Sequence, residues 1–237
     1  MLLSPETVSE TLDATWPAAR RTARGGWVLR AAPGAGRRVN AATAMRTGAC
    51  PEADELLREG HAVAMVRAGE DTLDARLQDA GWRAGPSVSL WAVECAKLAT
   101  MAEPGTVIGL WPPLAAAEDI WEATGSGPER RAVMERVRAP RAGLLARDGD
   151  RPAGAAFVAR HGPAGVLHQL ATLPEYRRRG VARRLLAAAA HWTAQEGGSA
   201  LWLFVEDGNA ASEELCRSCG AVSAPAYRYR LAPGLAE

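Results

Sequence analysis

The pattern of apolar and polar positions is clearest in the second half of the chain, where it predicts strands and helices in a definite order. Turn residues at Asp148-Gly149-Asp150 and Gly162-Pro163 separate apolar runs of strand length. The predicted strands are 107–111, 143–147, 154–160, 166–173, 201–205 and 227–231. Apolar residues at helical spacing predict helices over 114–124, 128–138 and 181–195, with a further helix after Asn209.

The first half of the chain alternates strand and helix signals in the same manner. Pro33-Gly34-Ala35-Gly36 predicts a hairpin turn between two strands. Strands are expected at 26–30, 39–45, 62–66 and 88–95, and helices at 6–16, 51–59 and 71–80. The stretch 97–104 has neither pattern and is predicted to be a linker. We therefore expect two domains, 1–98 and 105–237.

Composition and net charge limit the number of domains and the classes of partner, but they do not indicate a reaction. The 237 residues are enough for two modest domains. Lysine and arginine number 28 and aspartate and glutamate 27, giving a net charge of +1. A chain so nearly neutral has no overall field to attract nucleic acid or an anionic membrane, and we expect neither as a partner. Any recognition of charge must be local.

The four cysteines, Cys50, Cys95, Cys216 and Cys219, are too few and too scattered for a disulfide framework. We expect a reduced, cytoplasmic protein, since the first residues also turn polar too early for a signal peptide. Cys216-x-x-Cys219 has no second cysteine or histidine pair at ligand spacing. No metal site is therefore predicted.

The segment Arg177-Arg178-Arg179-Gly180-Val181-Ala182 stands where a predicted strand passes into a predicted helix. The start of a helix leaves backbone N–H groups unpaired and carries the positive end of the helix dipole. A phosphate can bind there, and a glycine lets its oxygens approach the backbone closely. An arginine triplet is also typical of a solvated helix face. The surrounding order favours the phosphate site.

Arg177-x-x-Gly180-x-Ala182 resembles the acetyl-CoA signature of the GNAT superfamily of N-acetyltransferases. The preceding Leu173-Pro174-Glu175-Tyr176-Arg177 is similar to that family's strand end, and Asn209, Leu215 and Gly220 match its later helix. The resemblance covers residues 105–231. It implies a GNAT fold of the α/β class (α+β type), with a mixed, mostly antiparallel sheet flanked by helices. Residues 1–98 resemble a degenerate second copy without the cofactor motif, which would make the protein a tandem GNAT.

The resemblance also implies a binding site for acetyl-CoA. In the family, the strand before the signature is bulged and splays from its neighbour, so that the pantetheine arm enters between them. Leu170, Ala171 and Thr172 would bind that arm, and the Leu170 N–H would donate to the thioester oxygen. The diphosphate would be held by Arg177, Arg178, Arg179, Gly180, Val181 and Ala182. Asn209 would hold the cofactor from the neighbouring helix.

Two residues are candidates for proton transfer. His168 lies on the strand before the signature and titrates near neutral pH, so it is the candidate base; it could equally be paired to a backbone carbonyl. Cys216 stands where the family has a tyrosine acid. It either protonates departing coenzyme A or only packs, and Tyr227 or Tyr229 could serve instead.

The function implied is direct transfer of acetyl from acetyl-CoA to the amine of a small molecule or to an exposed amino group. The alternative is a GNAT-like module that binds acyl-CoA without catalysis, which the Cys216 replacement and the degenerate first half favour. The pattern does not distinguish a monomer from a homodimer. It also leaves the acceptor open.

Overall fold

The computed structural model describes residues 4–101 and 105–235. Residues 1–3, part of the segment 1–6 from which no signal peptide was expected, and residues 102–104 of the predicted linker lie outside these ranges. The first half contains α1 (Pro5–Thr15), β1 (Arg20–Arg24), β2 (Trp27–Ala31), η1 (Arg37–Asn40), β3 (Thr43–Ala44), α2 (Ala53–Arg58), β4 (Val63–Arg67), α3 (Asp71–Asp79), β5 (Arg83–Glu94) and α4 (Cys95–Ala99).

The second half follows the predicted order closely, and its central helix has the predicted bounds. Its elements are β6 (Val107–Leu110), α5 (Ala115–Ala123), α6 (Pro128–Arg136), β7 (Arg141–Asp148), β8 (Arg151–His161), β9 (Ala164–Thr172), η2 (Pro174–Tyr176), α7 (Val181–Gln195), β10 (Ala200–Glu206), α8 (Ala210–Ser218) and β11 (Val222–Leu231). Within the described ranges, none of the helices combines the length and apolar character needed to cross a membrane.

Eight strands form one sheet in the order β4-β11-β5-β10-β9-β8-β7-β6, and β1, β2 and β3 form a second, small sheet. Every neighbouring pair in the large sheet is antiparallel except β10 with β9, which α7 connects as a crossover. The predicted α/β class, with a mixed and mostly antiparallel sheet flanked by helices, is confirmed.

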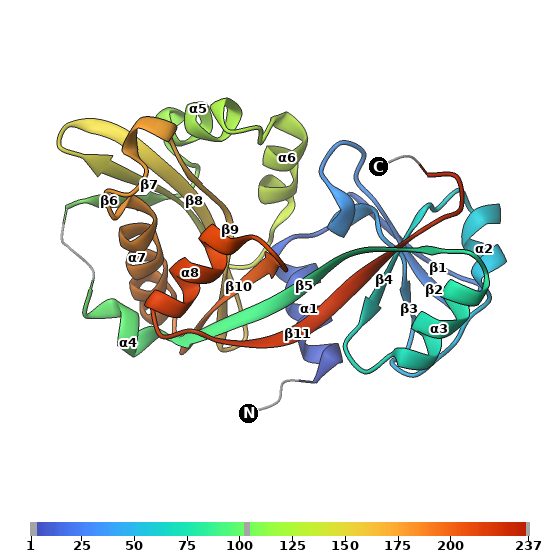
Figure 1. Ribbon diagram of the computed structural model, residues 1–237. Coiled ribbons are helices and arrows are strands. Elements are labelled where there is room, and N and C mark those ends of the chain that lie inside the picture. Colours follow the sequence, from blue (N-terminus) through green and yellow to red (C-terminus); the bar gives the residue numbers. More distant parts are fainter. Residues whose placement is uncertain (1–3, 102–104, 236–237) are drawn as a thin grey trace.

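The two halves of the chain exchange their last strands. β5, from the first half, lies between β10 and β11, and β11, from the second half, lies between β5 and β4. Figure 1 shows β5 and β11 as two long strands that run side by side from one lobe to the other. The large sheet is therefore continuous across the predicted boundary near residue 100.

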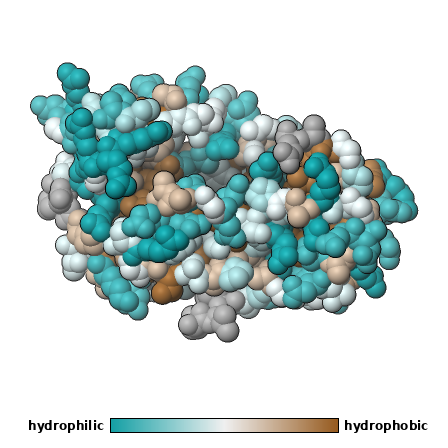
Figure 2. Space-filling view, in the orientation of Figure 1, coloured by the Kyte–Doolittle hydropathy of each residue, from teal (hydrophilic) through white to brown (hydrophobic). Residues whose placement is uncertain are grey.

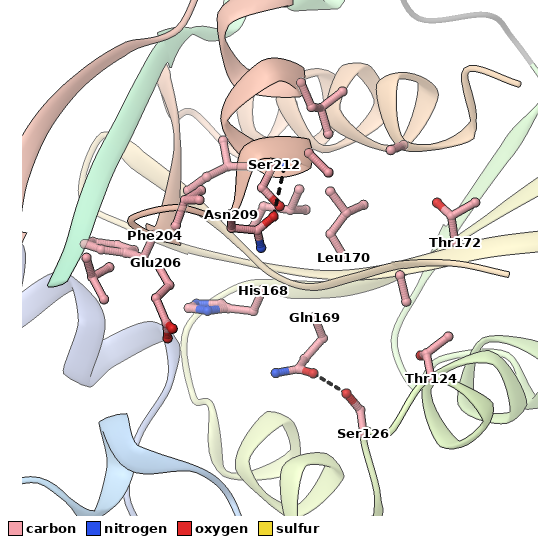
Figure 3. Close-up of a pocket in the computed structure, with 18 of the residues that line it drawn as sticks. Thr124, Ser126, His168, Gln169, Leu170, Thr172, Phe204, Glu206, Asn209 and Ser212 are labelled. Carbon is pink, nitrogen blue, oxygen red and sulfur yellow. Dashed lines mark hydrogen bonds between the residues drawn. The ribbon is translucent and has the colours of Figure 1, made fainter. Parts of the chain in front are cut away.

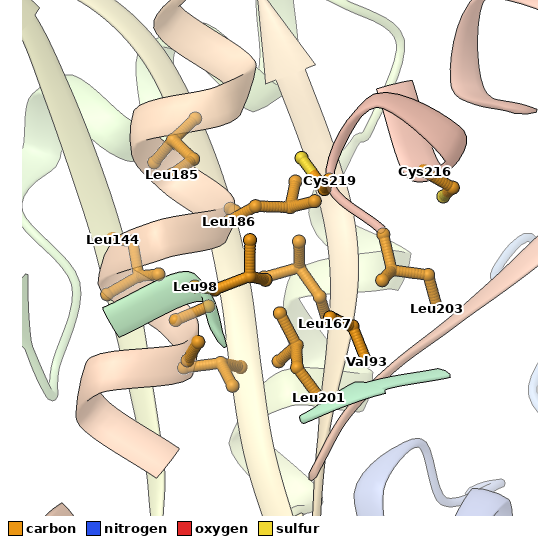
Figure 4. Close-up of a cluster of buried hydrophobic side chains, with 14 of the residues drawn as sticks. Val93, Leu98, Leu144, Leu167, Leu185, Leu186, Leu201, Leu203, Cys216 and Cys219 are labelled. Atoms are coloured by element: carbon orange, nitrogen blue, oxygen red, sulfur yellow. The ribbon is translucent and has the colours of Figure 1, made fainter. Parts of the chain in front are cut away.

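Apolar side chains alternate between the two faces of this sheet, and each face is covered by helices. Leu144 faces α7, whose buried face includes Leu185 and Leu186, while Leu145 faces the helices α5 and α6. Figure 4 shows the α7 side of this core, where α4 adds Leu98. α7 is rich in alanine and leucine, the strongest helix formers, so propensity and packing agree. The rigid α7 thereby fixes the position of the loop that precedes it.

Three predictions for the first half were wrong in detail. The predicted strand 39–45 is shorter, because η1 occupies 37–40 and only Thr43–Ala44 pairs with β2. β1 was missed, since its residues are all exposed and carry no apolar alternation. The linker prediction at 97–104 was wrong over 97–99, where α4 continues and buries Leu98.

Candidate active site

β9 contains a bulge at Gln169 and Leu170. Ala155 pairs with Ala171 and Phe157 with His168, so two residues of β9 lie opposite one residue of β8. Gln169 has φ of 49°, an uncommon value for a residue with a side chain. The bulge turns His168 and Gln169 toward the same side of the strand, as Figure 3 shows.

Contacts from outside β9 hold the bulge in place. The Trp121 Nε1–H donates to the Gln169 carbonyl at 2.9 Å. The Gln169 side-chain carbonyl accepts from the Ser126 hydroxyl and from Arg130 Nη1, the latter at 3.2 Å. These three donors come from α5, α6 and the turn between them, so the second half of the chain fixes the strained residue.

Beyond the bulge, β9 and β10 diverge. Their parallel pairing ends at Leu167 with Leu203, so the edge of β9 over 168–172 has no partner on β10. A groove of about 1160 Å³ opens there, lined by Leu170, Ala171 and Thr172 on one side and by Leu203–Glu206 on the other. The bulge and splay predicted for this strand are both present.

The predicted phosphate cradle forms the end of the same groove. Gly180 is the N-cap of α7 with φ of 76°, and no side chain caps this helix. Within the described ranges no hydrogen bond reaches the backbone N–H groups of residues 181–183. Gly154 on β8 lets the helix start lie against the sheet, since a Cβ there would come within 2.6 Å of Val181 Cγ1.

The arginine side chains at the cradle divide into two groups. Arg177 and Arg178 are exposed and line the groove, and neither has a carboxylate partner among the described residues. Arg179 does not line the groove, because its guanidinium pairs with Asp148 at 3.2 Å and lies over the Tyr176 ring. Figure 2 shows hydrophilic surface over this end of the molecule, with apolar surface in the hollow beside it.

Asn209 lies at the groove as the N-cap of α8, where its Oδ1 accepts from the Ser212 N–H at 3.2 Å. Its Nδ2 is left to donate, and Figure 3 shows this nitrogen directed away from the helix and toward β9. Nine of the ten predicted cofactor residues line one groove: Leu170, Ala171, Thr172, Arg177, Arg178, Gly180, Val181, Ala182 and Asn209.

His168 lines the groove but is almost completely buried, stacked on Trp16 with ring centroids 4.9 Å apart. The Thr15 hydroxyl donates to the Thr11 carbonyl, so its oxygen accepts from His168 Nε2–H at 3.1 Å. Nδ1 is then the acceptor and faces Arg38 Nη1 at 3.5 Å. Burial, and secondly the Arg38 charge, lower the pKa of His168 well below its usual value.

This buried imidazole predicts a loss of stability at acid pH. The unfolded chain takes up a proton near pH 6.5 whereas the folded chain does not, so the free energy of unfolding falls as pH drops from 6.5 toward the lowered pKa. We expect up to about 1.4 kcal/mol per pH unit in that window. Urea unfolding at pH 7.5 and 5.5 measures it. His168→Gln should lose this part of the slope, and His191→Gln, at an exposed position on α7, should keep it. Equal slopes in both variants would contradict the assignment.

Comparison with known proteins shows which family the residues around the groove resemble. Residues 111–221, which include the bulge, the cradle and Asn209, match the acetyltransferase (GNAT) family. The match covers a little under half of the chain and supports the GNAT superfamily for this region. No curated protein matches the chain.

Solved GNAT structures extend the likeness to the whole fold. A GCN5-related N-acetyltransferase from Kribbella flavida superposes with a TM-score of 0.72 at 18% identity, covering 99% of this chain and 97% of that one. A putative GNAT acetyltransferase from Novosphingobium aromaticivorans superposes with a TM-score of 0.56 at 19% sequence identity, covering 89% of each chain. A tandem GNAT protein from the clavulanic acid biosynthesis pathway superposes with a TM-score of 0.56 at 14% sequence identity. The superposition covers 77% of this chain and 68% of that one. The GNAT fold accounts for both halves.

Cys216 lies away from the groove that a GNAT acid would serve. It is fully buried in the core beneath α7, where Figure 4 shows it with Cys219 and Leu203, and it is not among the residues that line the groove. Burial raises the pKa of its thiol to about 12, and Cys219 adds to the shift. This position fits packing, one of the two roles left open by the sequence; the acid role stays a prediction without support from the geometry.

Sequence reasoning missed several groove residues because distant elements contribute them. Glu206 ends β10 and Arg38 lies in η1, while Trp16 follows α1. Glu206 could have been found from the sequence, because it is the polar residue directly after the predicted strand 201–205, which became β10. Arg38 and Trp16 carry no local signal, since only the packing of the first half against β9 brings them to the groove.

Proposed function

We propose that this chain is an acetyl-CoA-dependent N-acetyltransferase that transfers acetyl directly to an amine. One observation carries the proposal: a single groove joins an unpaired strand edge at 168–172 to a row of free backbone N–H groups at 181–183. An extended pantetheine arm fits the first, and a diphosphate fits the second. The match of residues 111–221 to the GNAT family supports it.

The groove fits coenzyme A by shape and by charge. Gly180 presents no side chain in front of the helix start, and Ala182 is small. Arg177 and Arg178 add cations at the exposed rim, where they suit phosphate oxygens. Leu170, Val205 and Leu215 make the middle of the groove apolar, as the uncharged arm requires.

Bound acetyl-CoA would supply the acetyl group as an activated thioester. The Leu170 N–H, held by the bulge, would donate to the thioester oxygen as that oxygen becomes negative. The rigid contacts of Gln169 with Trp121, Ser126 and Arg130 keep this donor in position before the reaction. Asn209 Nδ2 would donate to the cofactor from α8.

An alkylammonium acceptor must lose a proton before it can attack, because its pKa is about 10.4 when lysine-like. The base predicted from the sequence was His168. Its Nδ1 faces the Arg38 cation, which together with burial makes the imidazole a weak base. Glu206 lines the same groove with an exposed carboxylate and has no ion pair among the described residues. We therefore assign proton removal to Glu206, through a water, ahead of His168.

The departing thiolate would take its proton from a tyrosine of β11. Tyr227 and Tyr229 both line the groove, and the Tyr227 hydroxyl accepts from Arg38 Nε at 3.0 Å. Burial, and then Tyr227, raise the pKa of Tyr229 well above its usual value, which makes this phenol a weak proton donor, so Tyr227 is the candidate acid. Either phenol is better placed than Cys216.

The test is a turnover assay with acetyl-CoA and a broad panel of amines, which follows thiol release and the mass of the acceptor. The proposal predicts thiol release that depends on the amine, with one acetyl added to it. Saturable binding of acetyl-CoA without thiol release against any amine would overturn it and leave the non-catalytic acyl-CoA module. The buried Cys216 and the lowered pKa of His168 are the observations that favour that alternative.

Replacing the proposed base gives a specific prediction. Glu206→Gln should lower kcat about a hundredfold, the usual contribution of general-base catalysis, and leave the dissociation constant for acetyl-CoA unchanged. Glu214→Gln removes the same charge from the wall of the groove on α8 and should retain kcat. If His168→Gln lowers kcat as strongly while Glu206→Gln does not, the imidazole is the base after all.

We further propose that residues 1–98 form a degenerate GNAT-like domain without a cofactor site and 105–237 the acetyltransferase domain. The likeness to a tandem GNAT protein and the symmetric placement of β5 and β11 support this division. Among the described residues of the first half, the α-helices begin after Ser4, Glu52, Glu70 and Glu94, and the glycine N-cap Gly36 precedes only the four-residue 3-10 helix η1. The first half instead contributes Trp16 and Arg38 to the groove wall.

A further inference from the structure

The arm of the groove beyond His168 contains two arginines whose charge is not neutralised. Arg38 comes from η1 in the first half, and Arg130 from α6 in the second. No carboxylate oxygen of the described residues lies within 4.0 Å of either guanidinium. Both side chains are half-buried, so water compensates them only in part.

The groups that do face Arg38 and Arg130 are neutral. Arg38 donates to the Tyr227 hydroxyl at 3.0 Å, approaches His168 Nδ1 at 3.5 Å and lies over the Phe204 ring. Arg130 donates from Nη1 to the Gln169 side-chain carbonyl at 3.2 Å. Each guanidinium has five N–H donors, so several remain available to a ligand.

The fully buried arginines among the described residues each pair with a carboxylate. Arg30 pairs with Asp13, Arg67 with Glu70, and Arg230 with Asp74. Arg131, the residue next to Arg130 on the same helix, pairs with Glu118. Arg136, Arg141 and Arg160 are half-buried and also lack a carboxylate partner among the described residues, but none of them lines this groove. Arg38 and Arg130 are therefore the half-buried arginines that leave positive charge in this arm of the groove.

The two arginines also lie close to each other and to the reacting centre. Arg130 Nη2 lies 3.7 Å from the place that a Cβ on Gly36 would occupy, and Gly36 is two residues from Arg38. Arg38 approaches His168 and Arg130 contacts Gln169, which directly precede Leu170, the proposed oxyanion donor. An anion held by this pair would therefore lie beside the proposed reacting centre.

We propose that the acceptor is a small amine that also carries an anionic group, a carboxylate or a phosphate, and that Arg38 and Arg130 bind this group. The proposal rests on the proposed function, whose site it completes. Arginine forks bind both anions through paired N–H donors. Glu206, which lines the same groove, supplies the negative charge that an ammonium group needs. An amino-acid-like acceptor satisfies both.

Binding to the coenzyme A complex tests this without requiring turnover. The protein saturated with coenzyme A is titrated calorimetrically with matched pairs of probes: the common amino acids against their carboxamides, and phosphoethanolamine against ethanolamine. We expect at least one anionic probe to bind ten to a hundred times more tightly than its neutral partner, as a charge-assisted pair provides. The pair that shows this preference distinguishes carboxylate from phosphate. No preference in any pair would overturn the proposal.

Variants of the two arginines test whether they cause the tighter binding of anionic probes. Arg130→Met should reduce it to threefold or less in protein that is still saturated with coenzyme A, and Arg38→Met should act in the same direction. Arg138→Met removes an exposed arginine outside the groove and should keep the full preference. A preference that survives both Arg130→Met and Arg38→Met would contradict the assignment.

The outcomes separate this inference from the proposed function. Thiol release with neutral and anionic amines at equal KM leaves the acetyltransferase standing and refutes the anionic acceptor. Selective binding of an anionic amine without thiol release supports the anion site and refutes the enzyme.

Discussion

Gly180→Val is expected to abolish useful binding of acetyl-CoA while leaving the fold intact. Gly180 has φ of 76°, where a β-branched residue is strained by about 1–2 kcal/mol. The new side chain also stands in front of the free N–H groups of residues 181–183, and each charge-assisted hydrogen bond lost there costs about 1.5–3 kcal/mol. Together these predict a dissociation constant at least about a hundredfold higher, measured by calorimetry.

The opposite end of the same helix supplies a matched control. Gly197 has φ of 85°, and a Cβ there would have no atom within 4 Å. Gly197→Val therefore imposes the same backbone strain on α7 without touching the groove. It should lower the free energy of unfolding about as much as Gly180→Val and leave acetyl-CoA binding unchanged. Equal loss of binding in both variants would show that the effect comes from the helix and not from the cradle.

Asp74→Ala is expected to destabilise the protein by about 3–5 kcal/mol, because it leaves a buried guanidinium without its partner. Asp74 on α3 accepts from Arg230 Nε at 2.7 Å and from Arg230 Nη2 at 2.8 Å, and Arg228 adds a third bond at 3.1 Å. Arg228 and Arg230 lie on the exchanged strand β11. The cluster therefore joins the first half of the chain to the last strand of the second. Urea unfolding measures the loss.

Asp79→Ala, at an exposed position on the same helix with no ion pair among the described residues, is the control and should change stability by no more than about 0.5 kcal/mol. The hydrogen bond from Arg230 lowers the pKa of Asp74, so its contribution is present above pH 3.8 and is lost as pH falls toward the lowered pKa. A similar small effect of Asp74→Ala and Asp79→Ala would mean that β11 does not depend on this cluster.

Local sequence was sufficient for the elements around the cofactor groove, because α7, β9 and β10 agree with their own patterns. α7 has the predicted bounds Val181–Gln195, and the strands on either side of the groove are within two residues of their predicted positions. Glycine at position 180 and a run of alanines after it are local signals for a helix start. The cradle and the strand before it could thus be located from the sequence, whereas the bulge was expected only from the resemblance to the GNAT family.

The acceptor side of the groove could not be predicted, because long-range packing builds it. His168 was chosen as a base from its type and its strand, yet Thr15, Trp16 and Arg38 decide its protonation, and all three come from the first half. The exchange of β5 and β11 likewise has no local signal. Both strands were predicted without their neighbours, β5 at about two thirds of its length and β11 at half. The contacts of His168 and the neighbours of β5 and β11 depend on how distant segments pack together, and the local pattern of apolar and polar residues does not predict that packing.

The central claim is that free backbone N–H groups at the start of α7 bind the diphosphate of coenzyme A. The most direct test is a calorimetric titration of the wild-type protein with acetyl-CoA and, separately, with acetyl-pantetheine, which lacks the diphosphate. We predict saturable binding of acetyl-CoA and an affinity for acetyl-pantetheine at least about a hundredfold weaker. No heat with acetyl-CoA, or equal affinity for the two compounds, would contradict the account.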